Sequence, residues 1–348
     1  MTADDQRRRW DTVLGHLAAA LPRGAARVVV DGGDGRAAQF ADRFAAHLHA
    51  GGRHCVRLTA AACTSDRDGW YTRTPDTVVI ADGPGWRRRL PAASWHLTVW
   101  VRTPPAATTG ASSASGGFRG DDTDAVIDLH DAAWPVLRHL DARLVDGDVW
   151  HRSESQAFFA GRAATWDTRF GDDLPAYVAA VAQSGFAPGD TVVDAGCGTG
   201  RALPALRDAT GPHGTVIGVD LTPQMLAAAA DRARACHASL LLADARHLPF
   251  AGATVDGVFA AGLITHLPDA AAGLAELARV TRPGGRLVLF HPSGRAALAA
   301  RHGRALRPDE PLAEPVLRAS AAAAGWLLTS YDDPPHRFHA VAVRRTAA

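Results

Sequence analysis

The stretch Thr191–Gly200 constrains the fold of this chain more than any other. A β-branched run ends in Asp194, and three glycines follow at alternate positions up to Gly200. A strand, a tight glycine turn and a helix bring bare backbone against a nucleotide-like ligand. A dinucleotide fingerprint has its third glycine one residue later, where this chain has Arg201, whose bulk prevents close helix–strand packing. The spacing therefore predicts a nucleotide-like ligand and disfavours a dinucleotide.

The composition limits the class of protein. With 348 residues, the chain is long enough for two domains, each with its own core. Its hydrophobic fraction of 47% and charged fraction of 21% are typical of a globular protein. A net charge of +1 argues against a large nucleic-acid interface, so we expect no nucleic-acid partner. The chain contains no lysine, which excludes any mechanism that needs a lysine ammonium.

The cysteines and the N-terminal segment bear on location. The four cysteines form no C-x-x-C pair and no Cys/His cluster with zinc spacing, so we expect no metal and a reducing, cytoplasmic setting. Arg7–Arg9 precede an apolar run, Val13–Leu21, that superficially resembles a signal peptide. This run is short, contains His16 and leads into a strand at Arg27–Asp31, which favours an amphipathic helix. No run is long enough to span a membrane.

The second half alternates strand and helix patterns, and we place a domain boundary near Val149–Glu154, giving domains at 1–150 and 151–348. Strands are predicted at Thr191–Asp194, Thr215–Asp220, Ser239–Ala243, Val255–Ala260, Arg286–His291, Trp326–Tyr331 and Arg337–Arg344. Helices are predicted at Phe158–Phe170, Ala176–Val181, Pro223–Ala235 and Ala270–Val280. The alternation implies an α/β fold with a doubly wound, parallel sheet. A short connection joins the last two strands and cannot form a parallel crossover, so the final strand is expected to be antiparallel.

Several segments resemble one family in order and spacing. Asp194-Ala-Gly-Cys-Gly-Thr-Gly200 resembles the first motif of class I S-adenosyl-L-methionine (SAM)-dependent methyltransferases, of the type 11-like group. Later segments resemble the family's ribose segment, adenine segment, fourth strand with its loop, and fifth strand, at Gly218–Leu226, Asp244–Phe250, Val255–Asp269 and Glu276–Leu289. The resemblance covers the chain from about residue 155 onward. It implies a seven-stranded Rossmann-like sheet, a transferase activity and SAM as the cofactor.

The same resemblance implies a three-part cofactor site. The residues for the methionine end are Asp194, Ala195, Gly196, Cys197, Gly198 and Gly200. Asp220 and Leu221 correspond to the ribose end, and Asp244 and Ala245 to the adenine end. The three acids follow three strands, and ligands bind at the carboxyl edge of an open α/β sheet.

The sequence leaves three possibilities for the catalytic group: His266, His291 or no catalytic side chain. His266 lies in the loop after the fourth strand, and His291 ends the fifth. Either imidazole has a pKa suited to a general base, and either also fits a structural role, which is the interpretation that we favour. Methyl transfer also proceeds through proximity and orientation alone.

Two further groups have both a functional and a structural interpretation. Trp166 and Phe170 fit a cover over the cofactor or substrate, and they fit ordinary packing. A set of arginines fits a basic rim for an anionic substrate or a solvated helix face: Arg295, Arg301 and Arg304.

The first half resembles another family, the uridine-kinase-like P-loop proteins. Arg27–Asp42 indicates a strand, a glycine-rich turn and a helix, and Thr77–Asp82 indicates a strand that ends in an acid. A working loop has G-x-x-x-x-G-K-[ST], but this chain has Ala, Ala and Gln at Ala37–Gln39 where the last three residues belong. A low-complexity stretch, Pro104–Gly117, stands where a kinase has its lid. We therefore expect a degenerate, catalytically inactive kinase-like domain.

The leading hypothesis from the sequence is a methyltransferase that acts on a small-molecule acceptor, with no membrane partner. The alternative is a non-catalytic SAM or nucleotide sensor, because the altered P-loop indicates that one domain of this chain has already lost the residues for its reaction. An active nucleoside kinase is disfavoured by Ala38. The acceptor, the methylated atom and the oligomeric state are left undetermined by the sequence.

Overall fold

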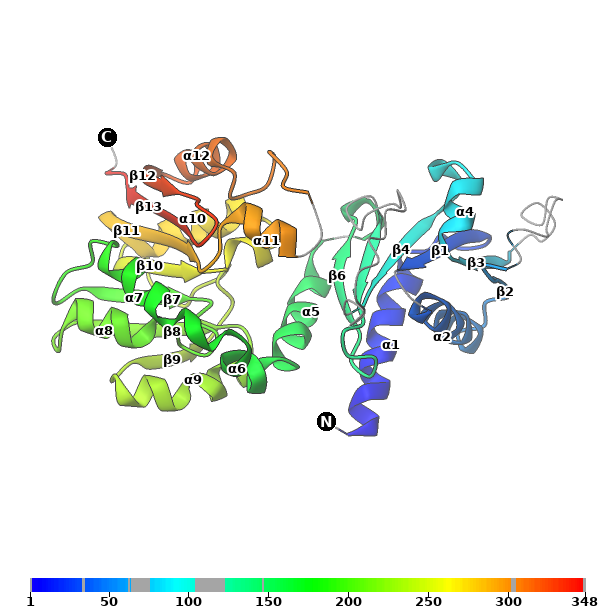
Figure 1. Cartoon of the computed structure of the whole chain (residues 1–348), viewed down its shortest axis with the longest axis horizontal. Coiled ribbons are helices and arrows are strands. Elements are labelled where there is room, and N and C mark those ends of the chain that lie inside the picture. The colour runs from blue at the N-terminus through cyan, green and yellow to red at the C-terminus, as the bar shows by residue number, and fades with distance from the viewer. Residues whose placement is uncertain are drawn as a thin grey trace. The chain divides into compact units, whose positions relative to one another are not determined.

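The structure is a computed structural model, and it describes residues 2–32, 35–61, 63, 76–103, 123–145, 147–301 and 305–346. The low-complexity stretch Pro104–Gly117 and Arg304 lie outside these residues, as does the side chain of Phe170. The chain forms two compact units, Met1–Ser155 and Gln156–Ala348, each built on its own sheet (Figure 1).

The sheet of the N-terminal unit has six strands in the order β2-β3-β1-β4-β5-β6. Its strands are β1 (Ala26–Gly32), β2 (Cys55–Leu58), β3 (Val78–Asp82), β4 (Leu97–Arg102), β5 (Ala125–Asp128) and β6 (Val136–Leu140). All neighbouring pairs are parallel except β5 and β6, which are antiparallel. Because strands buried on both faces read as continuous apolar runs, the Val28–Val30 run of β1 is fully buried.

Helices cover both faces of this sheet. On one face, α1 (Ala3–Ala19) and α2 (Arg36–Ala50) pack their apolar sides over the core of β1, β3 and β4. On the other face, Trp86 of α4 (Pro84–Arg89) packs with Val29 and Ala81. The Val13–Leu21 run is thus largely the apolar stripe of a helix, as predicted from its pattern.

The sheet of the C-terminal unit has seven strands in the order β12-β13-β11-β10-β7-β8-β9. Its strands are β7 (Thr191–Ala195), β8 (Thr215–Asp220), β9 (Ser239–Leu242), β10 (Val255–Ala261), β11 (Thr281–His291), β12 (Trp326–Asp332) and β13 (Phe338–Arg344). Only β13 runs antiparallel to its neighbours, β11 and β12. The predicted seven-stranded α/β sheet with an antiparallel last strand is confirmed.

Helices also cover both faces of the second sheet (Figure 1). One face is covered by α7 (Leu174–Ala182), α8 (Leu203–Thr210) and α9 (Pro223–Ala235), and the other by α10 (Ala270–Val280) and α12 (Glu314–Ala323). Three further helices are α5 (Val149–Ala160), α6 (Trp166–Phe170) and α11 (Arg295–Arg301). The strand register places the carboxyl ends of β7, β8 and β10 at one edge, where the candidate site lies.

Two predicted elements differ from the structure. The predicted helix Phe158–Phe170 is interrupted, because α5 ends at Ala160 and α6 begins at Trp166. Gly161 follows α5 directly, and glycine is among the poorest helix formers. Strand β11 begins at Thr281 instead of Arg286, since Thr281 pairs with Val255 before a shift in register.

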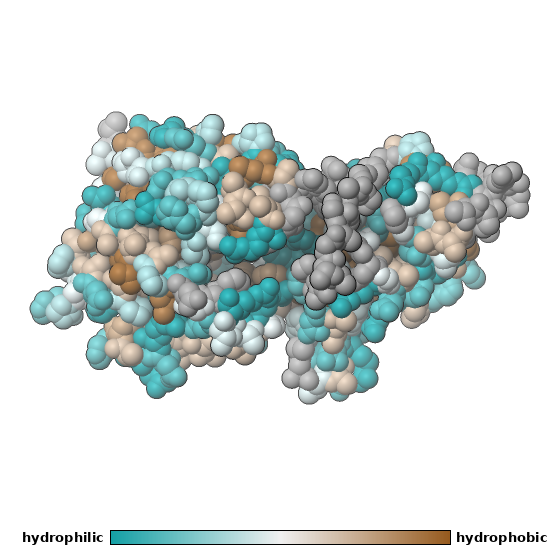
Figure 2. Space-filling model, viewed as in Figure 1, coloured by the Kyte–Doolittle hydropathy of each residue, from teal (hydrophilic) through white to brown (hydrophobic). Residues whose placement is uncertain are grey.

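The surface mixes hydrophilic and hydrophobic residues in the view of Figure 2. Large apolar side chains that are exposed include Leu174 and Val178 of α7 and Leu327 of β12. Within the described ranges, no helix combines the length and the apolar character that crossing a membrane requires.

Candidate functional site

The turn after β7 is closed by hydrogen bonds to the end of β8. The N–H groups of Gly196 and Cys197 donate to the Val219 carbonyl at 2.8 and 2.9 Å. The Gly198 N–H donates to Asp220 Oδ2 at 2.9 Å, and the Thr222 N–H donates to Asp220 Oδ1 at 2.8 Å. Asp220 therefore organises the turn and the start of α9 together.

Two of the three glycines explain the shape of this turn. Gly200 has φ of +78°, and a Cβ there would lie 2.8 Å from Leu203 Cδ1, so glycine lets α8 pack closely. Gly198 has φ of +54°, and a Cβ there would meet no heavy atom within 4 Å. The backbone at Gly198 thus borders open space, which is the geometry that a ligand approaching bare backbone requires.

Asp194, in β7, is a buried carboxylate whose two oxygens have no hydrogen-bond partner among the described residues. Burial and repulsion from Asp220 raise the pKa of Asp194 to about 8. Burial also raises the pKa of Asp220. An unpaired buried carboxylate is costly, so these two acceptor oxygens fit a ligand that brings a cation or hydrogen-bond donors.

The predicted adenine acid follows β9, but its carboxylate is already paired. Arg246 Nη2 donates to Asp244 Oδ2 at 2.8 Å, and Arg246 Nε lies 3.1 and 3.2 Å from the two oxygens. Burial raises the pKa of Asp244, but hydrogen bonds from Arg246 outweigh it and lower the pKa. Ala245 is buried beside it, and the carbonyl of Leu221 accepts a hydrogen bond from Gln156 Nε2 at 2.9 Å.

The first candidate histidine lies in an aromatic cluster. The His266 ring centroid is 5.1 Å from that of Phe159 and 6.4 Å from that of Phe158. Phe159 also contacts Trp166, at 5.8 Å between centroids. The structure thus brings His266 and Trp166 into contact with the same ring.

The second candidate histidine lies against the segment that follows β11. The His291 Nδ1 lies 3.0 Å from the backbone N and 2.9 Å from the carbonyl of Ser293, and Arg301 Nη2 donates to Ser293 Oγ at 2.7 Å. Burial lowers the pKa of His291, so the ring is neutral at pH 7. Arg295 is held by Glu310 and Asp333, at 3.3 and 3.5 Å, which argues against a free basic rim.

Sequence reasoning missed two features near the turn. Asp167 of α6 binds the side chains of Thr199, Arg201 and Arg232, and no motif or spacing marked it. Tyr177 of α7 meets Phe290 edge to face, with the ring centroids 5.0 Å apart, and burial with the nearby Asp194 carboxylate raises the Tyr177 pKa. Because Tyr177 lies in an apolar helix, the sequence pattern did not distinguish it from an ordinary packing residue.

Comparisons with known proteins agree with this geometry. Residues 193–289 match the model of a family described as a methyltransferase domain. The match supports a class I SAM-dependent methyltransferase with SAM as its cofactor, as predicted from the sequence.

Relatives of known name match part of the chain. Methyltransferase GfsG of Streptomyces halstedii is 40% identical over 105 residues, 29% of this chain and 37% of that protein. A demethylmenaquinone methyltransferase of Symbiobacterium thermophilum is 33% identical over 143 residues, 40% of this chain and 53% of that protein. The chain thus spans about a third to half of the length of these relatives.

A solved structure also resembles part of the chain. It is a complex between the Haloferax volcanii Trm112 methyltransferase activator and a methyltransferase. The match has a TM-score of 0.46 and 24% identity, and it covers 54% of this chain and 98% of that one.

We predict that Gly198→Ala weakens SAM binding about tenfold or more, because its methyl group enters the open space beside the turn. Gly284→Ala is the matched control, since Gly284 also has positive φ, +78°, and no atom near its Cβ position. Both substitutions should cost about 1 kcal/mol of stability for the left-handed backbone. Calorimetric titration and thermal unfolding measure the two effects, and equal affinities of the two variants would contradict the prediction.

We predict that SAM affinity rises with pH between about pH 5.5 and about pH 7.5. The Asp194 carboxyl has a raised pKa of about 8, so it must lose its proton to pair with the ammonium group of SAM, and this loss becomes easier as the pH rises. The ammonium of the ligand stays mostly charged over this range. Calorimetry in buffers of different ionisation enthalpy should record proton release on binding by the wild type. Asp194→Asn should lose the release and the pH dependence, and retention of both would refute the assignment.

Proposed function

We propose that the C-terminal unit transfers the methyl group of SAM to a small-molecule acceptor. The observation that carries this proposal is the turn Gly196–Gly200, whose backbone is closed onto Asp220 while Asp194 stays buried and unpaired. Bound SAM supplies an electrophilic methyl group. The relative that is named for demethylmenaquinone supports a small-molecule acceptor.

The roles of the residues follow from their chemistry. Each oxygen of Asp220 uses one lone pair for a backbone N–H, so each keeps one for a ribose hydroxyl. Asp194 faces the ammonium of the methionine end, where burial strengthens the attraction. Asp244, with Ala245 beside it, binds the adenine, and Arg246 fixes the Asp244 carboxylate for that contact.

The acceptor side has two proposed proton acceptors. His291 is neutral at pH 7 because burial lowers its pKa, and a neutral imidazole is able to take a proton from an acceptor hydroxyl. His266 borders the aromatic cluster of Phe159 and Trp166, where an apolar acceptor would pack. An acceptor that ionises readily needs only to be held in line with the methyl group.

We predict that the wild type binds SAM and that Asp220→Asn weakens binding at least tenfold. Loss of the charge makes this side chain a weaker hydrogen-bond acceptor, both for the ribose hydroxyls and for the backbone N–H groups of the turn. Asp231→Asn is the control, since Asp231 lies nearby on α9 and its side chain is 92% exposed. Calorimetry measures the affinities, and equal affinities of the two variants would overturn the proposed site.

The same protein should then transfer labelled methyl groups from SAM to small hydroxylated acceptors. SAM binding without transfer to any acceptor pool would favour the alternative, a non-catalytic sensor.

For the N-terminal unit, we propose a degenerate P-loop domain without phosphotransfer. Strand β1 leads through a glycine-rich segment into α2, as in a P-loop, but Ala38 stands at the lysine position. The acid at the end of β3, Asp82, is neutralised by Arg57 Nη2 at 2.7 Å, which opposes a magnesium role. The free thiols of all four cysteines suit the proposed cytoplasmic setting.

We predict no ATP-dependent phosphorylation of uridine by the full chain, because a phosphate-binding lysine and an unpaired metal-binding acid are both absent from the described P-loop elements. A coupled kinase assay with magnesium measures this. Turnover above the rate of a heat-treated sample would disprove the assignment, and heat of binding with ATP alone would indicate a retained nucleotide site.

A further inference from the structure

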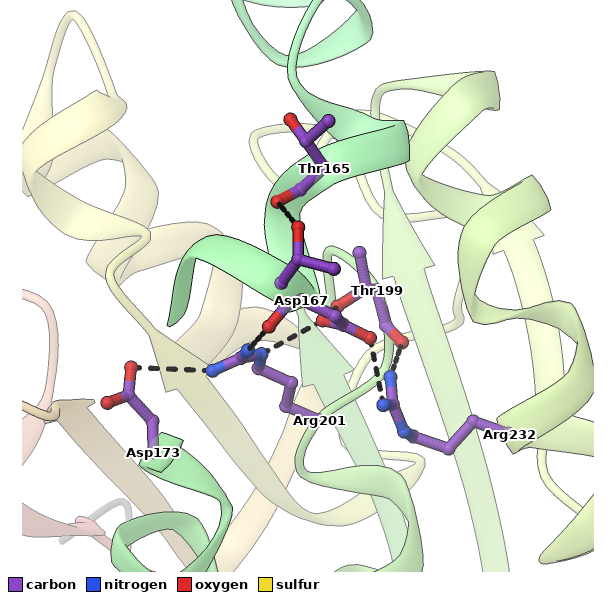
Figure 3. A network of polar contacts seen from close by, with 7 residues as sticks. Thr165, Asp167, Asp173, Thr199, Arg201 and Arg232 are labelled. Carbon is purple, nitrogen blue, oxygen red and sulfur yellow. Dashed lines mark hydrogen bonds and ion pairs between the residues drawn. The ribbon is translucent and has the colours of Figure 1, made fainter. Parts of the chain in front are cut away.

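Helix α6 is tied to the glycine-rich turn by a single carboxylate (Figure 3). Asp167 Oδ1 accepts hydrogen bonds from Thr199 Oγ1 at 2.6 Å and from Arg201 Nε at 3.1 Å. Asp167 Oδ2 accepts one from Arg232 Nη2 of α9 at 2.9 Å. Both carboxylate oxygens therefore bind side chains from other elements.

The same two arginines also bind backbone carbonyls. Arg232 Nη1 donates to the carbonyl of Thr199, inside the turn. Arg201 Nη2 lies 3.4 Å from the carbonyl of Asp167 itself. The network therefore fixes the main chain of the turn and of α6, in addition to their side chains.

Burial and charge make this network costly to disrupt. Thr199 and Arg201 are buried, and Arg201 pairs with Asp167 and, at 3.3 Å, with Asp173. Burial raises the pKa of Asp167, but hydrogen bonds from Thr199, Arg232 and Arg201 outweigh it and lower the pKa. Asp167 is thus ionised at pH 7, and it offsets the charge of a buried guanidinium.

The turn needs such a support because of its composition. Thr199 lies between Gly198 and Gly200, both with positive φ, so the backbone there has few side chains to hold it. Asp220 holds the Gly198 N–H from the side of β8. Asp167 holds the next residue from the side of α6, so the turn is fixed at two successive residues.

Asp167 also follows Trp166, which belongs to the aromatic cluster with Phe159 and His266. A change at Asp167 therefore reaches both the turn and the aromatic cluster. We propose that Asp167 is a positioning residue, which fixes the turn at Thr199 and holds α6 beside the cofactor. This inference rests on the proposed function of the turn as the SAM site.

The test compares SAM affinity and dissociation rate in matched variants of the full chain. Asp167→Asn should raise the SAM dissociation constant about tenfold, because a neutral amide weakens all three contacts. Asp173→Asn is the control, since Asp173 contacts Arg201 but neither Thr199 nor Arg232 in the network of Figure 3. It should bind SAM within about threefold of the wild type.

Conservative variants separate positioning from folding. Thr199→Ser keeps the hydroxyl and should bind as the wild type does, whereas Thr199→Val should lose part of what Asp167→Asn loses, because it removes one of the three contacts. The double variant Asp167→Asn/Thr199→Val should lose less affinity than the sum of the two single losses, since both variants disrupt the contact between Asp167 and Thr199. Measurements at about 10 °C with circular dichroism ensure that folded protein is compared.

Each outcome decides between the interpretations. Unchanged SAM affinity in Asp167→Asn, or additive losses in the double variant, would overturn the positioning role and leave the proposed function intact. Absence of SAM binding by the wild type would instead remove the proposed function, and this inference with it.

Discussion

The hydrogen bond from the Gly198 N–H to Asp220 organises the cofactor edge of the C-terminal unit. It joins the turn after β7 to the end of β8, and the second oxygen of Asp220 receives the Thr222 N–H at the start of α9. One side chain thus sets the relative positions of two strand ends and a helix. Without it, the turn, which has positive φ at three glycines, would depend on the hydrogen bonds of Gly196 and Cys197 to Val219 and on the contacts of Thr199 with Asp167 and Arg232.

Two aspartates at this edge have opposite surroundings. Asp167 has a partner for each oxygen, which lowers its pKa, whereas Asp194 has none among the described residues and a pKa raised to about 8. The fully paired carboxylate contributes to the order of the backbone. The unpaired one reduces the stability of the ligand-free protein, and a bound cation would recover that loss. Such strained groups are typical of sites where stability has been exchanged for function.

The sequence predicted most of the C-terminal fold because each element has a local signal. The bounds of β8, α9 and α10 agree with the predicted ranges, since Pro223 begins one helix and Asp269 caps the other. The antiparallel β13 followed from a connection too short for a crossover. The break after Ala160 was missed. The apolar spacing typical of a helix continues through Gly161, but the helical backbone of α5 ends at Ala160.

The candidate site was only partly predictable. Asp194 and Asp220 stand at the ends of clear strands, so sequence patterns locate them. The pairing of Asp244 with Arg246 and the network around Asp167 depend on side-chain directions and on contacts between segments far apart in the chain. The periodicity of the sequence does not encode such contacts. Hydrophobic patterning locates the buried face of a helix, but it does not predict that an arginine side chain will pair with an acid on an earlier helix.

The position of β13 has a consequence for folding during synthesis. This strand follows β12 in the chain but lies between β12 and β11 in the sheet. Until residues 338–344 leave the ribosome, the side of β11 that later pairs with β13 therefore stays unpaired, although the strands that carry the candidate cofactor site have already been made. Strand β12 also has no neighbour to pair with at this stage. The nascent C-terminal unit thus passes through a stage with a long unpaired strand, when chaperones or neighbouring chains have their best access to it.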